Sequence, residues 1–145
     1  MRPRRLELEE LLKTLVKEHE VVRGLLTKLH TLLQQDKHAE AAQELREFQP
    51  YLDQHIIDEE ATVLKLFIDS LGRDGAALAV QVFQEHRKIH QLISEMQAMA
   101  ETAPEKLTEM KGRMAEIFEK HFRAEETEVF PWALKLYKDK RDSMR

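Results

Sequence analysis

The chain has 145 residues, of which 42% are hydrophobic and 34% are charged. This length and composition predict a single domain over residues 1–145 and exclude both a disordered chain and a membrane-spanning one. Cysteine is absent, which rules out disulfides, thiolate metal sites and cysteine nucleophiles. The 23 basic and 27 acidic residues give a net charge of −4, so no basic excess indicates nucleic acid as a partner. The informative surplus is in histidine, with seven residues.

The start of the chain, MRPRRLELEELLK, is basic and then amphipathic, without the apolar stretch of a signal peptide. No run of about 18 apolar residues occurs elsewhere. We therefore expect a cytoplasmic protein that does not contact a membrane.

Four amphipathic helices in chain order account for most of the sequence. The first is predicted over residues 6–34, because apolar residues and one histidine recur there at steps of three and four: Leu8, Leu12, Leu15, His19, Val22, Leu26, Leu29 and Leu33. The second is predicted over residues 39–70. Pro50 lies inside it and predicts a kink or a short 3₁₀ break.

The third helix is predicted over residues 76–100, after a loop in which Gly72 suits a left-handed cap and Asp74 a helix start. The fourth is predicted over residues 103–138. Thr102 and Glu105 match a capping box before it, and Pro131 predicts a bend near its end. Long helices joined by short loops predict an all-α fold, an up-down-up-down antiparallel four-helix bundle.

The two halves of the chain share a His-x-x-x-Glu pattern. His55 and Glu59 are repeated 66 residues later as His121 and Glu125. On the preceding helices, Glu18-His19-Glu20 resembles Glu85-His86-Arg87, 67 residues later. The duplication breaks at His90, since the first half has Arg23 at the matching position. Two related helix pairs would bring these side chains together at one level and form a binuclear site.

Each His-x-x-x-Glu places an imidazole and a carboxylate on one helix face, about 6 Å apart along the axis. Unpartnered carboxylates and imidazoles are costly to bury, and a pair of cations would remove that cost. Imidazole and carboxylate suit Fe, Zn, Mn or Co. The predicted metal ligands are His19, His55, Glu59, His86, His90, His121 and Glu125.

One histidine on the first helix, His-x-x-x-Glu on the second and fourth, and His-x-x-x-His on the third resemble the hemerythrin family, including its HHE cation-binding domains. The resemblance covers essentially the whole chain. It implies a hemerythrin-like bundle with a non-haem di-iron centre, in which an oxo or hydroxo group bridges the irons. Zn or Mn could take the place of the irons. By this similarity Glu59 and Glu125 would bridge the irons. One iron would be bound by His86, His90 and His121, and the other by His19 and His55.

The unequal division of histidines would leave an open position on the His19/His55 iron for O₂, peroxide, NO or azide. The resemblance favours a protein that binds O₂ or a related small molecule for sensing, storage or detoxification. His-x-x-x-Glu on the last helix departs from the His-x-x-x-x-Asp of oxygen carriers and is more like HHE proteins of repair and sensing type.

Three alternatives stay open. The site could belong to a di-iron enzyme that acts on peroxide or NO or repairs iron centres, to an iron-storage protein, or to a structural metal bundle. The sequence does not decide whether the chain is an enzyme or which reductase or protein partner it uses.

The neighbours of the ligands carry their own expectations. Glu60 and Glu126 either support an imidazole or lie on a solvated helix face. Arg23 is expected to be exposed, and the basic ends, residues 2–5 and 135–145, to be solvated or frayed. His30 is expected at one end of the bundle and His38 in a loop or a first helical turn.

Overall fold

The computed structural model describes residues 2–143, which are almost entirely helical and contain no strand. The α-helices are α1 (Leu8–Gln34), α2 (His38–Asp58), α3 (Lys65–Leu71), α4 (Arg73–Thr102), α5 (Leu107–Ala124) and α6 (Phe130–Ser143). Two π-helical segments, η1 (Glu59–Leu64) and η3 (Glu125–Val129), join α2 to α3 and α5 to α6, and the 3₁₀ turn η2 (Pro104–Lys106) precedes α5. The chain therefore forms four long helical rods, and the prediction of an all-helical bundle is confirmed.

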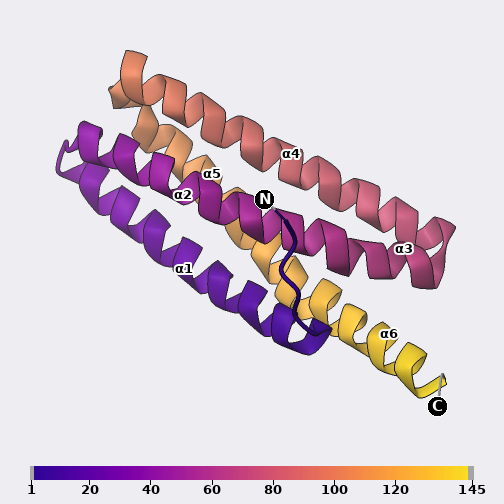
Figure 1. The fold of residues 1–145 in the computed structure, drawn as a ribbon. Helices are drawn as coiled ribbons and strands as arrows, with labels where there is room; N and C mark the ends of the chain where they lie inside the picture. The colour runs from indigo at the N-terminus through magenta and orange to yellow at the C-terminus, as the bar shows by residue number, and fades with distance from the viewer. Residues whose placement is uncertain (1, 144–145) are drawn as a thin grey trace.

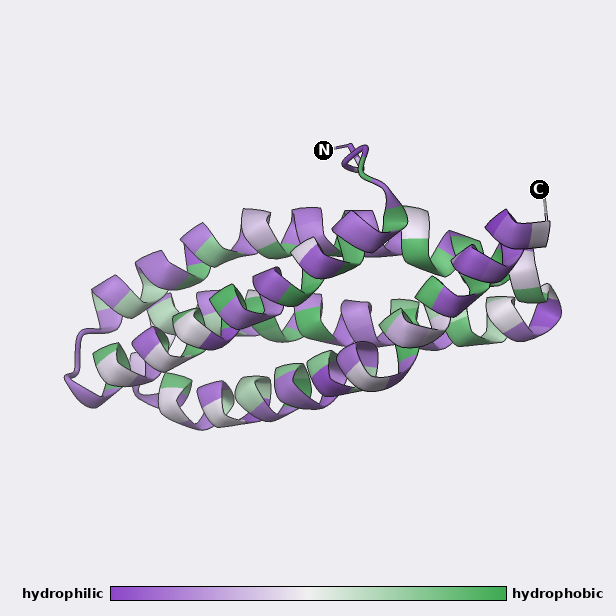
Figure 2. Cartoon of the chain, turned by 90° about the horizontal axis from the view of Figure 1, so that it is seen from below, coloured by the Kyte–Doolittle hydropathy of each residue, from purple (hydrophilic) through white to green (hydrophobic). Residues whose placement is uncertain are grey.

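The four rods surround a common core (Figure 1). α1 packs on α2 and α5, and α4 packs on the same two helices. Each rod turns apolar residues inward and polar residues outward, so the two kinds alternate around every helix in Figure 2.

The core is divided into two large apolar clusters and a small third one formed by Leu64, Ala79 and Val82. One large cluster begins at Val22 and includes Phe118 and Phe122, and the other includes Leu15 and Phe67. His19 is buried between Leu15 and Val22 on the stripe of α1. The polar level at His19 therefore interrupts an otherwise apolar interior.

α2 stays α-helical through Pro50, so of the two alternatives predicted there, a kink or a short 3₁₀ break, the 3₁₀ break is wrong. A proline removes a single backbone hydrogen bond, and the burial of Phe48 and Leu52 on either side holds the helix in place. The rod departs from α geometry further on, in η1.

Pro131 lies just inside α6, and the irregularity expected there begins earlier, at Glu125 in η3. The backbone N–H of Phe130 bonds to the carbonyl of Glu125, five residues before it. A proline ring crowds the carbonyl four residues before it, and the wider π turn makes room for that ring.

The loop before α4 depends on two glycines. Gly72 has φ 59° and ψ −123°, so the positive φ expected there is present but the conformation is not the left-handed helical one. α4 begins at Arg73, three residues before the predicted start at residue 76. A Cβ atom on Gly75 would lie 1.9 Å from the carbonyl oxygen of Phe67, so this glycine allows α3 and α4 to approach closely.

The capping box predicted at Thr102 is wrong. Its hydroxyl donates to the carbonyl of Ala98 at 3.0 Å, inside the end of α4, and no side chain caps η2. The fourth rod starts two residues later, where Pro104 opens the 3₁₀ turn.

Among residues 2–143, none of the helices combines the length and the apolar content that a bilayer-spanning segment needs.

Candidate metal centre

Six of the seven predicted ligands meet at the polar level of the bundle. They come from all four rods and are His19 of α1, His55 of α2, Glu59 of η1, His86 of α4, His121 of α5 and Glu125 of η3. None of the six is more than 7% exposed. Nitrogen or oxygen atoms of Glu59, His86, His121 and Glu125 lie within 4.8 Å of one another, and so do those of His19, His55 and Glu125.

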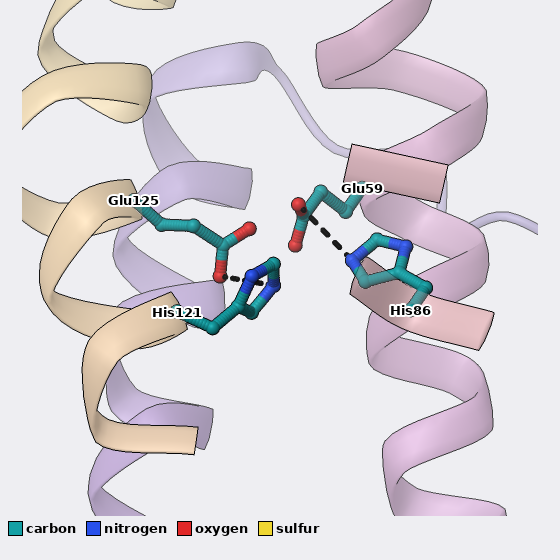
Figure 3. A group of neighbouring side chains, drawn as sticks. All are labelled: Glu59, His86, His121 and Glu125. Carbon is teal, nitrogen blue, oxygen red and sulfur yellow. Dashed lines mark ion pairs between the residues drawn. The ribbon is translucent and has the colours of Figure 1, made fainter. Parts of the chain in front are cut away.

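The four histidines of the cluster form two pairs, His19 with His55 and His86 with His121. Glu59 and Glu125 each contact one imidazole of each pair. One oxygen of Glu59 lies 3.6 Å from Nε2 of His55, and the other lies 3.4 Å from Nε2 of His86. Oε1 of Glu125 lies 3.1 Å from Nε2 of His19 and 3.3 Å from Nε2 of His121. Figure 3 shows the carboxylates of Glu59 and Glu125 pointing toward each other from opposite sides of the bundle, with His86 and His121 beside them.

The inward atoms of this cluster have no hydrogen-bond partner within the described residues. They are both oxygens of Glu59, both oxygens of Glu125, and Nε2 of His19, His55 and His86. Buried polar groups are almost always satisfied, and each unsatisfied one costs about 1–3 kcal/mol. A concentration of orphaned acceptors and ligand nitrogens at one point is the pattern that a bound cation would satisfy, so the residues present fit a metal.

The two glutamates have opposite pKa shifts. Burial and the negative charge of Glu59 raise the pKa of Glu125 well above its usual value. Burial also acts to raise the pKa of Glu59, but its interactions with Glu125 and with the imidazole of His86 outweigh burial, so this pKa is lowered. When two carboxylates are held together in an apolar interior, their pKa values move apart in this way. A metal would relieve the repulsion between the two negative charges.

Two histidines are also shifted in opposite directions. Burial, together with the charge of His55, lowers the pKa of His19 to about 4. Burial acts to lower the pKa of His86, but the neighbouring carboxylates of Glu59 and Glu60 raise it to about 9. The two helix pairs are thus similar in geometry but differ in electrostatic environment.

Outer carboxylates hold the far nitrogen of all four imidazoles. The Nδ1 atoms lie 3.4 Å from Glu126 for His19, 3.1 Å from Glu18 for His55, 2.8 Å from Glu60 for His86 and 2.6 Å from Glu85 for His121. A carboxylate at Nδ1 favours the tautomer with its proton there, which leaves the Nε2 lone pair free to face the centre.

The outer carboxylates run around the bundle in one sense. α1 provides Glu18 for α2, η1 provides Glu60 for α4, α4 provides Glu85 for α5, and η3 provides Glu126 for α1. Every rod therefore holds a histidine of one neighbour and has its own histidine held by the other. Of the two roles left open for Glu60 and Glu126, the structure favours imidazole support.

Both π-helical segments begin at an inward glutamate, Glu59 in η1 and Glu125 in η3. In each, the next residue is the outward glutamate that supports a histidine of another rod. Wide turns of this kind are rare and occur often at functional sites. The duplication seen in the sequence thus extends to the backbone geometry.

His90 is the one predicted ligand that the structure does not bring to the cluster. Its Nε2 lies 3.6 Å from a carboxylate oxygen of Asp53, and its side chain is 40% exposed. Four residues advance about 6 Å along a helix and about 40° around it, which takes His90 away from the level of His86. The three-to-two division of imidazoles is therefore replaced by two imidazoles in each group.

Arg23, expected to be exposed, instead forms ion pairs with three glutamates. Its guanidinium contacts Glu119 at 2.9 Å, Glu126 at 3.0 Å and also Glu20. It also lies over the ring of Phe122, 5.5 Å from the ring centre, and that ring stacks on His19 at 3.9 Å. Arg23 thus contacts two of the residues that position His19.

Arg4 was expected to be solvated, and it instead binds two buried carboxylates, Asp58 and Glu18. The sequence held a signal for Glu18, since the Glu-His pair recurs as Glu85-His86. It held none for Arg4 or Asp58, which lie outside the duplicated pattern. As predicted, His38 is in a first helical turn, and His30 lies away from the cluster beside Lys111.

Comparison with known families supports a cation site in this bundle. The family model described as Hemerythrin HHE cation binding domain matches residues 77–144. The match confirms the predicted resemblance over this part of the chain, which includes His86, His121 and Glu125. No curated protein and no solved structure matches the chain. The family match and the geometry of the six side chains both support metal binding by this bundle.

Proposed function

We propose that this chain forms an up-down-up-down bundle that binds two iron ions, and that the di-iron centre binds O₂ or a related small molecule for sensing, storage or detoxification. His86 and His121 would hold one ion, His19 and His55 the other, and Glu59 and Glu125 would be shared. When bound, the irons would supply redox chemistry and an affinity for small ligands that no side chain here has.

The observation that carries this proposal is the position of the two carboxylates. Glu59 directs one oxygen to each histidine pair, and Glu125 lies within 3.3 Å of an imidazole of each pair. A carboxylate shared between two imidazole pairs can bridge two ions. A single-ion site would need no such sharing and would leave one pair of imidazoles without a role.

The protein's own residues would set the conditions at the centre. The outer carboxylates fix the imidazoles, while Phe122 and Phe130 stack near His19 and keep water from that side. Because the six ligands are at most 7% exposed, the site suits a partner of a few atoms, such as O₂, NO or peroxide.

Metal analysis combined with optical spectroscopy tests the proposal. Protein produced with ample iron should contain two irons per chain and show a near-ultraviolet band that shifts on addition of azide. A colourless protein that contains only zinc would contradict it and favour a structural metal bundle. If the iron form consumes peroxide or reduces NO with turnover, the enzyme alternative replaces the binding role.

A further inference from the structure

Residues 2–7, here called the N-terminal strap, lie across the bundle before α1 begins (Figure 1). Two hydrogen bonds join the backbone of the strap to side chains of α2. The side chain of Gln54 donates to the carbonyl of Arg2 at 3.0 Å, and the backbone N–H of Arg4 donates to Asp58 at 2.7 Å. This extended segment is therefore held in a defined position.

The guanidinium of Arg4 joins two buried carboxylates on different rods. Its Nε donates to Asp58 at 2.5 Å, and its Nη2 lies 2.8 and 2.9 Å from the two oxygens of Glu18. The side chain of Asp58 is 0% exposed and that of Glu18 is 8% exposed. Buried carboxylates need a charged partner, and Arg4 is the one that both share.

Glu18 connects Arg4 to the candidate metal centre. The oxygen of Glu18 that accepts from Arg4 at 2.8 Å also lies 3.1 Å from Nδ1 of His55. Asp58, the other partner of Arg4, directly precedes the inward glutamate Glu59. The strap thus acts on the neighbourhood of one histidine pair, His19 and His55.

Among residues 2–143, the other half of the bundle has no equivalent of this arrangement. The residue 66 positions after Asp58 is Ala124, which has no charge to offer. Glu85, which holds His121, has a side chain 41% exposed, and no lysine or arginine among residues 2–143 forms an ion pair with it. His121 is therefore oriented without help from an arginine.

We propose that Arg4 is a positioning residue for one of the two metal positions: by fixing Glu18 it holds His55, so that occupancy of the His19/His55 position depends on the strap. Occupancy of the His86/His121 position does not depend on the strap. This inference rests on the proposed function, because it requires that two metal positions exist.

Titration of the metal-free full-length chain with Co²⁺, followed by calorimetry and absorption, tests the inference. The unmodified chain should bind two equivalents. Arg4→Met should bind the first equivalent unchanged and the second about 10- to 100-fold more weakly, the usual effect of removing support from a ligating histidine. The matched control is Arg5→Met, since Arg5 is the exposed neighbour and should change neither step.

Ligand variants assign the affected position. In a His121→Ala background, Arg4→Met should weaken the Co²⁺ binding that remains. In a His55→Ala background it should have no further effect. Equal weakening of both positions in the otherwise unmodified chain, or no weakening of either, would overturn the inference.

Arg4→Met leaves Asp58 buried without a partner, so the same titration is repeated on Arg4→Met/Asp58→Asn, which removes that charge. Selective loss in this double variant supports positioning, and full recovery of both binding steps contradicts it. If the unmodified chain binds no Co²⁺, the proposed function itself fails. That result differs from two binding steps that Arg4→Met leaves unchanged, which would contradict the inference alone.

Discussion

Glu125 is a buried carboxylate between two histidines, and the negative charge of Glu59 acts on it. Glu125→Gln keeps its volume and removes its charge. We expect the variant to hold at most one metal ion per chain, measured by elemental analysis. The melting temperature of the metal-free form should change little, because burial and Glu59 already raise the pKa of Glu125 and disfavour its charged form.

The control for this change is Glu128→Gln, which alters an exposed glutamate of the same π turn. It should keep full metal content. If Glu125→Gln also kept two ions, the shared role of Glu125 would be wrong.

His90 and His86 are one helical turn apart on α4 and differ sharply in surroundings. His90→Ala should leave the metal content unchanged, because its imidazole faces Asp53 on α2. His86→Ala should empty the His86/His121 position. Metal analysis of the two variants side by side decides the matter, and loss of an ion from His90→Ala would restore the ligand set predicted from the sequence.

Single residues also show where sequence reasoning succeeds and where it stops. The six ligands stand out because they are charged or polar positions on apolar stripes and because the pattern is duplicated: His19, His55, Glu59, His86, His121 and Glu125. His90 fits the same i,i+4 rule, yet the rule does not specify which neighbouring rod a side chain faces.

Arg4 could not be found in this way. It belongs to no periodic pattern, and its importance arises from contacts with residues 14 and 54 positions away.

Of the four glycines, Gly75 at the junction of α3 and α4 has the least room for a side chain. Gly75→Ala would place a Cβ 1.9 Å from a backbone oxygen that cannot move aside cheaply. We expect it to lower the free energy of unfolding by about 1–3 kcal/mol, as measured by chemical denaturation.

Gly112→Ala provides the comparison, since Gly112 lies in α5 and a Cβ atom added there would have no neighbour within 4 Å. There the exchange should raise the free energy of unfolding by about 0.5–1 kcal/mol, because alanine is the better helix former. A Gly75→Ala variant as stable as this control would show that α3 and α4 can separate without cost.

The extents of the rods were predictable to within a few residues from hydrophobic periodicity and from Gly72. The π turns were not, because a period of 3.6 residues describes the average helix and does not reveal a single widened turn. The cap expected at Thr102 failed for a similar reason: Thr102 and Glu105 had the right identity, but the preceding helix continued as far as Thr102.

For the molecule as a whole, metal binding should be a large part of stability. A ligand present at a hundred times its dissociation constant adds about 2.7 kcal/mol, and 1 kcal/mol moves the melting midpoint of a chain of this size by roughly 2–4 °C. Removing the metal with a chelator should therefore lower the midpoint by at least about 5 °C in calorimetry.

A His19→Ala/His86→Ala variant, which lacks one imidazole in each pair, serves as the reference. It should melt at the same temperature with and without chelator. An unmodified chain that is equally indifferent to chelator would mean that the buried ligands are satisfied without a cation.

The circle of carboxylates and imidazoles around the bundle has a consequence for ancestry and design. Its four links repeat after two rods, so two identical helical hairpins could close the same circle as a symmetric dimer. Joining the hairpins in one polypeptide removes the requirement that both halves stay alike. The Arg4–Asp58 contact, which only one half possesses, is the kind of difference that such a fusion permits.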